Sequence, residues 1–131
     1  MIFVDTSAWF AAMVPADNNH SAATLWLDLN TQPLITTDYV VSETLTLLRA
    51  RREAARALTL GRQFFEAPVA TIHYLTAAEV LETWQVFHQF ADKAWSFTDC
   101  ASKVVMENLG LNDAFAFDQH FHQFGSVAVV P

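Results

Sequence analysis

Short apolar runs alternate along the chain with longer segments in which apolar side chains recur at helical spacing. The runs that predict strands cover residues 2–4, 34–36, 69–72, 114–117 and 126–130. The segments that predict helices cover residues 8–14, 20–29, 39–49, 53–65, 76–90 and 98–109. Strands that alternate with helices form parallel sheets covered on both faces, so the chain is predicted to be an α/β protein. The third and fourth helical segments are predicted to form a helical hairpin near residues 39–66.

Polar residues at the starts of these segments predict how the helices begin. Asp5, Thr6 and Ser7 follow the first apolar run and can cap the first helix. Asp38 is predicted to cap the helix that starts at Tyr39, and Thr98 is predicted to cap the last helix.

Length and composition favour one compact domain over residues 1–131 with a hydrophobic core. The chain has 131 residues, of which 53% are hydrophobic and only 3 are glycine, which argues against disorder. No apolar run approaches the roughly 18 residues needed to span a bilayer, so no membrane association is expected. The single cysteine, Cys100, forms no internal disulfide and suits a reducing compartment, so the expected location is the cytoplasm.

The charge balance argues against a protein that binds nucleic acid through a broad basic surface. The formal net charge is -7 and the pI is about 4.9. If much of the negative charge were concentrated in one metal-binding cleft, divalent ions would neutralise it and bridge to the phosphates of a nucleic acid.

Four acidic residues are candidates for such a cleft. Asp5 and Asp118 directly follow predicted strands and should lie at the carboxyl edge of the sheet, where open α/β sheets bind ligands. Asp99 lies in the first turn of its helix. Glu43 lies in a strongly apolar helix, where a buried carboxylate needs a cation, a hydrogen-bond donor or an aqueous cleft. Carboxylates suit hard cations such as magnesium or manganese, and a pair of these ions can hold a phosphodiester for hydrolysis.

Each acid also has an ordinary explanation. Asp5 and Asp118 can be helix caps, and Asp99 can be a first-turn acid favoured by the helix dipole. Glu43 can be exposed or paired with Arg49. Composition and spacing alone leave both interpretations open.

Four segments together resemble the successive signatures of PIN-domain proteins. They are VDTSAWFAAM at the amino terminus, TTDYVVSETLTLL in the first third, SFTDCAS after residue 95 and AFAFDQHFHQFG near the end. They occur in the family's order over nearly the whole chain, whose length is similar to that of the single-domain VapC-type toxin ribonucleases of toxin–antitoxin pairs.

The resemblance implies a PIN-like three-layer fold with a central parallel sheet of about five strands flanked by helices. It assigns Asp5, Glu43, Asp99 and Asp118 to catalytic and metal-binding roles, with magnesium or manganese as the cofactor. The implied activity is hydrolysis of phosphodiester bonds in RNA, and the implied partners are RNA, a cognate antitoxin and a second copy in a homodimer.

Further substrate contacts are predicted beside the acids. Under the resemblance, Thr6 or Ser7 would orient a ligand or substrate phosphate. Arg49, Arg52 and Arg56 fall on one helical face if the helix continues through this region, and arginine matches the geometry of phosphate and carboxylate. Arg49 and Arg52 are therefore candidates for binding RNA or an acidic antitoxin segment, although a solvated surface explains them as well.

Other interpretations of the chain are weaker. His120 and His122 beside Asp118 suggest zinc or an acid–base pair, but no cysteine or further histidine completes a zinc site. The main alternative function is a catalytically weak PIN-like module that binds RNA or protein without cutting it. A phosphatase of the haloacid dehalogenase type lacks its Asp-x-Asp pair, because Asp5 is followed by Thr6 and Ser7.

Overall fold

Five short strands form one parallel sheet in the computed structural model, which describes all of residues 1–131. Their order across the sheet is β3-β2-β1-β4-β5, and every neighbouring pair is parallel. The strands are β1 (Ile2–Val4), β2 (Leu34–Thr37), β3 (Thr71–His73), β4 (Asp113–Phe115) and β5 (Ala128–Val130). The predicted α/β fold with a parallel sheet is therefore confirmed.

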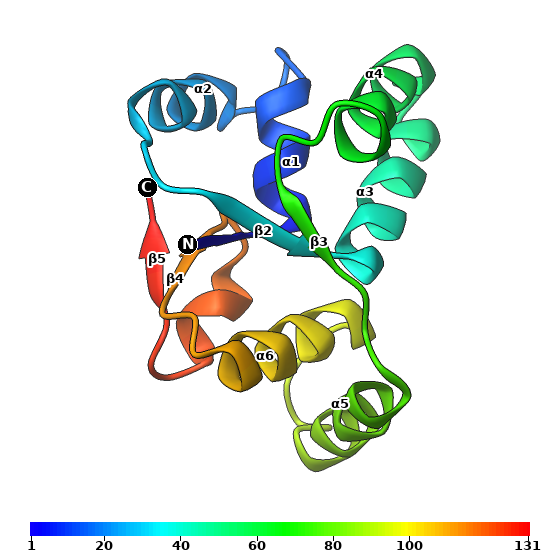
Figure 1. Cartoon of the computed structure of the whole chain (residues 1–131), viewed down its shortest axis with the longest axis vertical. Coiled ribbons are helices and arrows are strands. Elements are labelled where there is room, and N and C mark those ends of the chain that lie inside the picture. Colours follow the sequence, from blue (N-terminus) through cyan, green and yellow to red (C-terminus); the bar gives the residue numbers. More distant parts are fainter.

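Six α-helices connect and cover these strands. They are α1 (Thr6–Met13), α2 (His20–Leu29), α3 (Asp38–Ala50), α4 (Ala54–Phe65), α5 (Ala77–Gln89) and α6 (Phe97–Leu109). In Figure 1, α1 and α2 lie on one side of the strands, and α5 and α6 lie on the other. Helices α3 and α4 pack together as the predicted hairpin near residues 39–66.

The central strand β1 is buried on both faces, which explains why its sequence is a continuous apolar run. Phe3 stacks on Phe121 at 6.1 Å between ring centroids. Phe115 of β4 stacks on Trp26 of α2 at 4.2 Å. Phe121 belongs to a short 3₁₀ helix, η1 (Gln119–Gln123), so this packing anchors the segment after β4 to the centre of the sheet.

Two predicted helix caps were wrong by one or two residues. Thr37 caps α3, and its hydroxyl accepts a hydrogen bond from the Val40 N–H. Asp38 instead accepts a hydrogen bond from the Leu75 N–H at the loop after β3. Ser96 rather than Thr98 caps α6, because a serine with an acid three residues later forms a reciprocal capping box.

The break between α3 and α4 removes the predicted arginine face. Helix α3 ends at Ala50, and Arg52 adopts a left-handed conformation with φ of 63° before α4 begins. Arg49, Arg52 and Arg56 therefore do not share one helical face. Arg56 instead donates to the Met13 carbonyl and forms an ion pair with Glu53.

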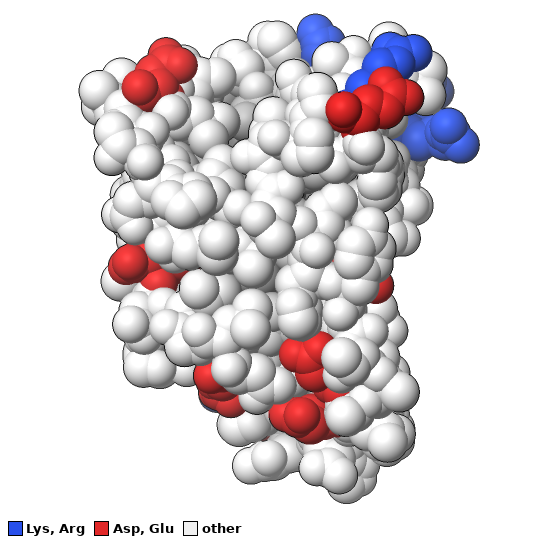
Figure 2. Space-filling view, viewed as in Figure 1, with Lys and Arg blue, Asp and Glu red and all other residues white.

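Charge is unevenly distributed over the molecule. Five arginines lie between residues 49 and 62, in or beside the α3–α4 hairpin. On the face shown in Figure 2, basic side chains gather at that end alone, whereas acidic side chains occur at both ends and between them. None of the helices is both long enough and apolar enough to cross a membrane.

Candidate functional site: an acidic cluster at the carboxyl edge of the sheet

The strand order reverses between β1 and β4, and this is where open α/β sheets form a crevice for ligands. Asp5 directly follows β1, and its N–H donates to the Phe115 carbonyl of β4 at 3.1 Å. Asp118 follows β4 after two further residues, because the strand ends at Phe115 rather than at Phe117. The predicted placement of both acids at the carboxyl edge is therefore observed.

The Ser7 hydroxyl joins these two segments. It donates a 2.6 Å hydrogen bond to Oδ2 of Asp5 and accepts hydrogen bonds from the N–H groups of Phe117 and Asp118 at 2.9 and 3.3 Å. The Ser7 N–H also donates to the same Asp5 oxygen. Ser7 therefore fixes the orientation of the Asp5 carboxylate and the path of the chain after β4.

Asp99 enters the cluster from the other side of the sheet. It lies in the first turn of α6 and is only 5% exposed. Its Oδ2 accepts a hydrogen bond from the Ser96 N–H at 2.9 Å as part of the capping box. The same oxygen accepts a 2.7 Å hydrogen bond from Nδ1 of His120.

His120 joins the acids, although the sequence did not favour it over His122 and it was not among the predicted site residues. Its Nδ1 lies 3.3 Å from Oδ1 of Asp118, and ligand atoms of Asp99, Asp118 and His120 lie within 4.8 Å of one another. Burial of Phe121 against Phe3 holds η1 in place, whereas His122 is exposed. In the sequence, only the spacing of Asp118 and His120 pointed to this histidine. The 3₁₀ turn of η1 determines that His120, and not His122, faces Asp99.

Three of the acids do have the capping roles that their ordinary explanations predict, and these roles are compatible with ligand binding. Asp5 caps α1, Asp118 caps η1, and Asp99 completes the α6 capping box. Each uses one carboxylate oxygen for these local bonds, namely Oδ2 of Asp5, Oδ2 of Asp99 and Oδ1 of Asp118. The second oxygen of each carboxylate has no hydrogen-bond partner in the protein and is free to bind a ligand.

Burial and neighbouring charge raise the pKa of Asp5 from 3.8 to about 7. Desolvation is the largest cause, and the negative charges of Asp99 and Asp118 add to it, while the hydrogen bonds from Ser7 act in the opposite direction. No lysine or arginine forms an ion pair with any of these acids. The cluster therefore lacks a permanent positive partner.

Glu43 is half-buried on α3, which packs against both α1 and α6. It forms no ion pair with Arg49 or any other residue, so the alternative explanation by pairing with an arginine does not hold. Leu47 and Arg51 follow Glu43 at intervals of four residues, which places all three on one face of α3. Leu47 and Arg51 line a cleft with Ser7 and Asp118, so the carboxyl-terminal end of this face borders the acids.

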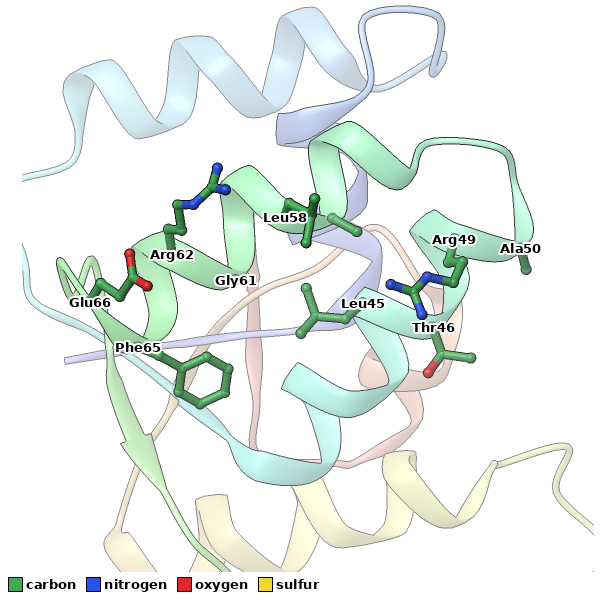
Figure 3. Close-up of a pocket in the computed structure, with 10 residues that line it drawn as sticks. Leu45, Thr46, Arg49, Ala50, Leu58, Gly61, Arg62, Phe65 and Glu66 are labelled. Atoms are coloured by element: carbon green, nitrogen blue, oxygen red, sulfur yellow. The ribbon is translucent and has the colours of Figure 1, made fainter.

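The remaining predicted site residues lie in different surroundings. Thr6 is 5% exposed, and its buried hydroxyl has no hydrogen-bond partner. Arg52 is exposed in the turn after α3. Arg49 lines a separate groove of about 880 Å³ between α3 and α4, together with Leu45, Leu58 and Phe65 (Figure 3). The structure thus brings Asp5, Asp99 and Asp118 together, places Glu43 half-buried on a helix that packs against α1 and α6, and leaves Arg49 and Arg52 outside the cluster.

Comparisons with known proteins identify relatives of the whole chain. A model of the PIN domain family matches residues 2–127. The 23S rRNA-specific endonuclease VapC20 of two Mycobacterium tuberculosis strains is 34% identical over 132 aligned positions, which cover 100% of this chain and 99% of the relative.

Solved structures agree with the sequence comparison. The crystal structure of Mycobacterium tuberculosis VapC20, described as a toxin that cleaves the sarcin-ricin loop, matches with a TM-score of 0.92 and 30% identity over the whole of both chains. FitAcB from Neisseria gonorrhoeae matches with a TM-score of 0.70 at 16% identity, covering 100% of this chain and 97% of its own. The FitAcB match supports the fold alone.

The raised pKa of Asp5 predicts a pH dependence of stability in metal-free protein. Between about pH 4 and pH 7 the folded state binds this proton and the unfolded state does not, so the free energy of unfolding should fall as the pH rises. Asp5→Asn should reduce this decrease in the free energy of unfolding by a few kcal/mol, since one pKa unit corresponds to about 1.4 kcal/mol. Urea unfolding with chelator present, repeated across this pH range, measures the free energy of unfolding.

Asp28→Asn is the matched control for this measurement, because Asp28 is exposed on α2. It should retain the pH dependence of the wild type. Equal pH slopes for the wild type and Asp5→Asn would show that Asp5 is not the group responsible.

Proposed function

Because the chain belongs to the PIN-domain family, we propose that it is a metal-dependent endoribonuclease that hydrolyses phosphodiester bonds in RNA. The observation that carries this proposal is the convergence of Asp5, Asp99 and Asp118, each with one carboxylate oxygen free of protein partners. Helix capping alone explains why each acid is there, but it does not require three of them to share one cluster.

The donor set fits a hard divalent cation. Asp5, Asp99 and Asp118 supply carboxylate oxygens, and Glu43, one helical turn before Leu47 of the adjoining cleft, is the fourth proposed ligand. The nearby Nδ1 of His120 is already bonded to Oδ2 of Asp99. Carboxylate donors of this kind favour magnesium or manganese over softer metals. Such an ion would polarise the phosphodiester and lower the pKa of an attacking water.

Residues of the chain hold these donors in a fixed arrangement. Ser7 orients Asp5 through two hydrogen bonds and fixes the backbone at Asp118. Ser96 orients Asp99 through the capping box. Fixed donors need no rearrangement when charge develops on the phosphate, and this is how preorganised sites lower a reaction barrier. Ser7 bonds to Asp5 and Asp118, two of the proposed metal ligands. A contact of Ser7 or Thr6 with the substrate remains a prediction.

The substrate class is single-stranded or loop RNA. VapC20 of Mycobacterium tuberculosis acts on 23S rRNA and cleaves its sarcin-ricin loop, as its descriptions state. Identity of 34% over the whole chain makes that loop the first RNA to test here.

Purified protein should cleave an RNA that contains the sarcin-ricin loop when magnesium or manganese is added, and chelator should stop the cleavage. Asp99→Asn and Asp118→Asn should each lower kcat/KM by more than about 100-fold, the upper range for losing even an outer partner of a metal. Asparagine still accepts the capping hydrogen bonds, so both variants should fold. Gel-based cleavage kinetics and thermal unfolding check both expectations.

Asp28→Asn again serves as the control and should cleave like the wild type. Equal cleavage by the Asp99 and Asp118 variants would reject the nuclease site. RNA binding without cleavage under any divalent ion would instead favour the catalytically weak binding module.

We further propose that a separate antitoxin restrains the enzyme. The groove between α3 and α4 supports a protein partner, because Leu58 and Phe65 in it are 55% and 58% exposed and Arg49 lies at its edge (Figure 3). A homodimer also remains a prediction. Leu81 and Trp84 on α5 support a homodimer, because they are large, exposed apolar side chains that a second copy would cover.

Arg49→Ala and Arg52→Ala test the predicted arginine contacts. Each removes a charge that can pair with RNA phosphates or antitoxin carboxylates, so affinity for RNA or for the antitoxin should fall about 10-fold. The antitoxin to use is the product of a small reading frame adjacent to the gene, and calorimetry measures both affinities. Unchanged affinities for both ligands would reject a role for these arginines.

A further inference from the structure

A second cleft, which we call the Arg51 cleft, adjoins the acidic cluster. It has a volume of about 310 Å³ and is lined by residues that include Phe10, Asp17, Asn19, Arg51, Phe117 and Asp118. Ser7 and Asp118 belong both to this cleft and to the acidic cluster. A molecule in the cleft would therefore extend directly from a phosphate held at the acids.

We propose that the Arg51 cleft is a subsite for one unstacked nucleotide of the RNA beside the scissile phosphate. Arg51 binds the phosphate of that nucleotide, the Phe10 and Phe117 rings contact its base, and Asp17 and Asn19 read the base edge. This inference rests on the proposed ribonuclease function and specifies how that site selects its substrate.

Arg51 is the one arginine placed in the cleft next to Asp118. It follows the last residue of α3, and its guanidinium forms no ion pair with any acid. Arg56 differs, because its guanidinium is already bound to the Met13 carbonyl and to Glu53. An unpaired guanidinium beside a phosphodiester site is suited to a second phosphate, which it can bind through a bidentate fork.

Two aromatic side chains supply an apolar surface in the same cleft. Phe10 and Phe117 are both half-buried, so part of each side chain remains open to solvent. Phe117 is held in place by its N–H bond to Ser7 and by an edge contact with Phe115 at 5.8 Å. Aromatic rings beside a backbone-binding cation are the usual means of holding an unpaired base.

Asp17 adds hydrogen-bonding specificity. Its Oδ2 accepts a hydrogen bond from the Asn19 N–H at 2.9 Å, and its other oxygen has no partner in the protein. The free carboxylate oxygen can accept a hydrogen bond, and the edges of nucleobases carry amino and ring N–H donors.

The mixture of charges in the cleft favours a nucleotide over a peptide segment. An acidic segment would meet the carboxylates of Asp17 and Asp118, and a basic segment would meet Arg51. A nucleotide matches both ends, because it joins an anionic phosphate to a neutral base with hydrogen-bond donors.

Arg51→Ala tests the phosphate contact with two readouts. It should lower kcat/KM for the sarcin-ricin-loop RNA by about 10-fold, mainly through KM, and should reduce the salt dependence of RNA binding by about one charge. Binding is measured by fluorescence anisotropy on the non-cleaving Asp99→Asn background. Arg51→Lys should restore part of the salt dependence. Lys93→Ala, which removes a charge from the loop before α6, should change neither readout.

Asp17→Asn tests the base contact. It exchanges an acceptor for a donor, so it should change the preferred base at one position next to the cut when a randomised RNA pool is cleaved and sequenced. Asp28→Asn should leave the preference unchanged. Thermal unfolding of each variant confirms that the protein is folded.

The outcomes separate this proposal from the nuclease assignment. If the wild type cleaves RNA and both variants match it in KM, salt dependence and base preference, the subsite is rejected while the nuclease stands. If the wild type binds RNA through Arg51 but never cleaves it, the nuclease is rejected, and with it a subsite beside a scissile phosphate. Loss of only antitoxin binding in Arg51→Ala would overturn the subsite in favour of a protein contact.

Discussion

The parallel pairing of β1 with β4 is the constraint on which the site depends. It aligns Phe3 with Ala114 and Val4 with Phe115, and so brings the ends of two distant strands to one edge of the sheet. Ser7 then bonds to the Phe117 N–H across a sequence separation of 110 residues. Without this pairing nothing would hold Asp5 near Asp118, and their like charges would favour separation.

The fold reconciles capping with ligand binding by dividing each carboxylate between two tasks. One oxygen satisfies the backbone N–H groups at a helix start, which stabilises the helix and fixes the side chain. The other oxygen points to no protein partner. The helix starts also place partial positive charge near the acids, which partly offsets their repulsion. Burial, with a smaller contribution from the charges of Asp99 and Asp118, nevertheless raises the pKa of Asp5 to about 7.

Much of this arrangement could be predicted from the sequence because it follows from local patterns. Alternating apolar runs and helical segments identify the parallel sheet, and the positions of Asp5 and Asp118 after strands place them at its carboxyl edge. The apolar surroundings of Glu43 correctly indicate that it is not a free surface residue, although its suggested pairing with Arg49 does not form.

The roles of His120 and of the individual arginines could not be predicted, because they depend on tertiary contacts. His120 faces Asp99 because the packing of Phe121 on Phe3 sets the rotation of η1, and no local pattern encodes that contact. Which arginine lies beside the acidic cluster depends on where α3 ends. A continuous helix would group Arg49 with Arg52 and Arg56, whereas the left-handed turn at Arg52 leaves Arg51 on the face that continues from Glu43.

If the acids at the β1–β4 edge share a divalent cation, the metal-free protein should bind manganese through them. Titration of the chelator-treated protein with manganese, followed by the electron paramagnetic resonance signal of the free ion, measures this binding. The wild type should remove manganese from the free pool, and a double Asp5→Asn, Asp118→Asn variant should not. Equal binding by both proteins, or no binding by the wild type at millimolar manganese, would contradict it.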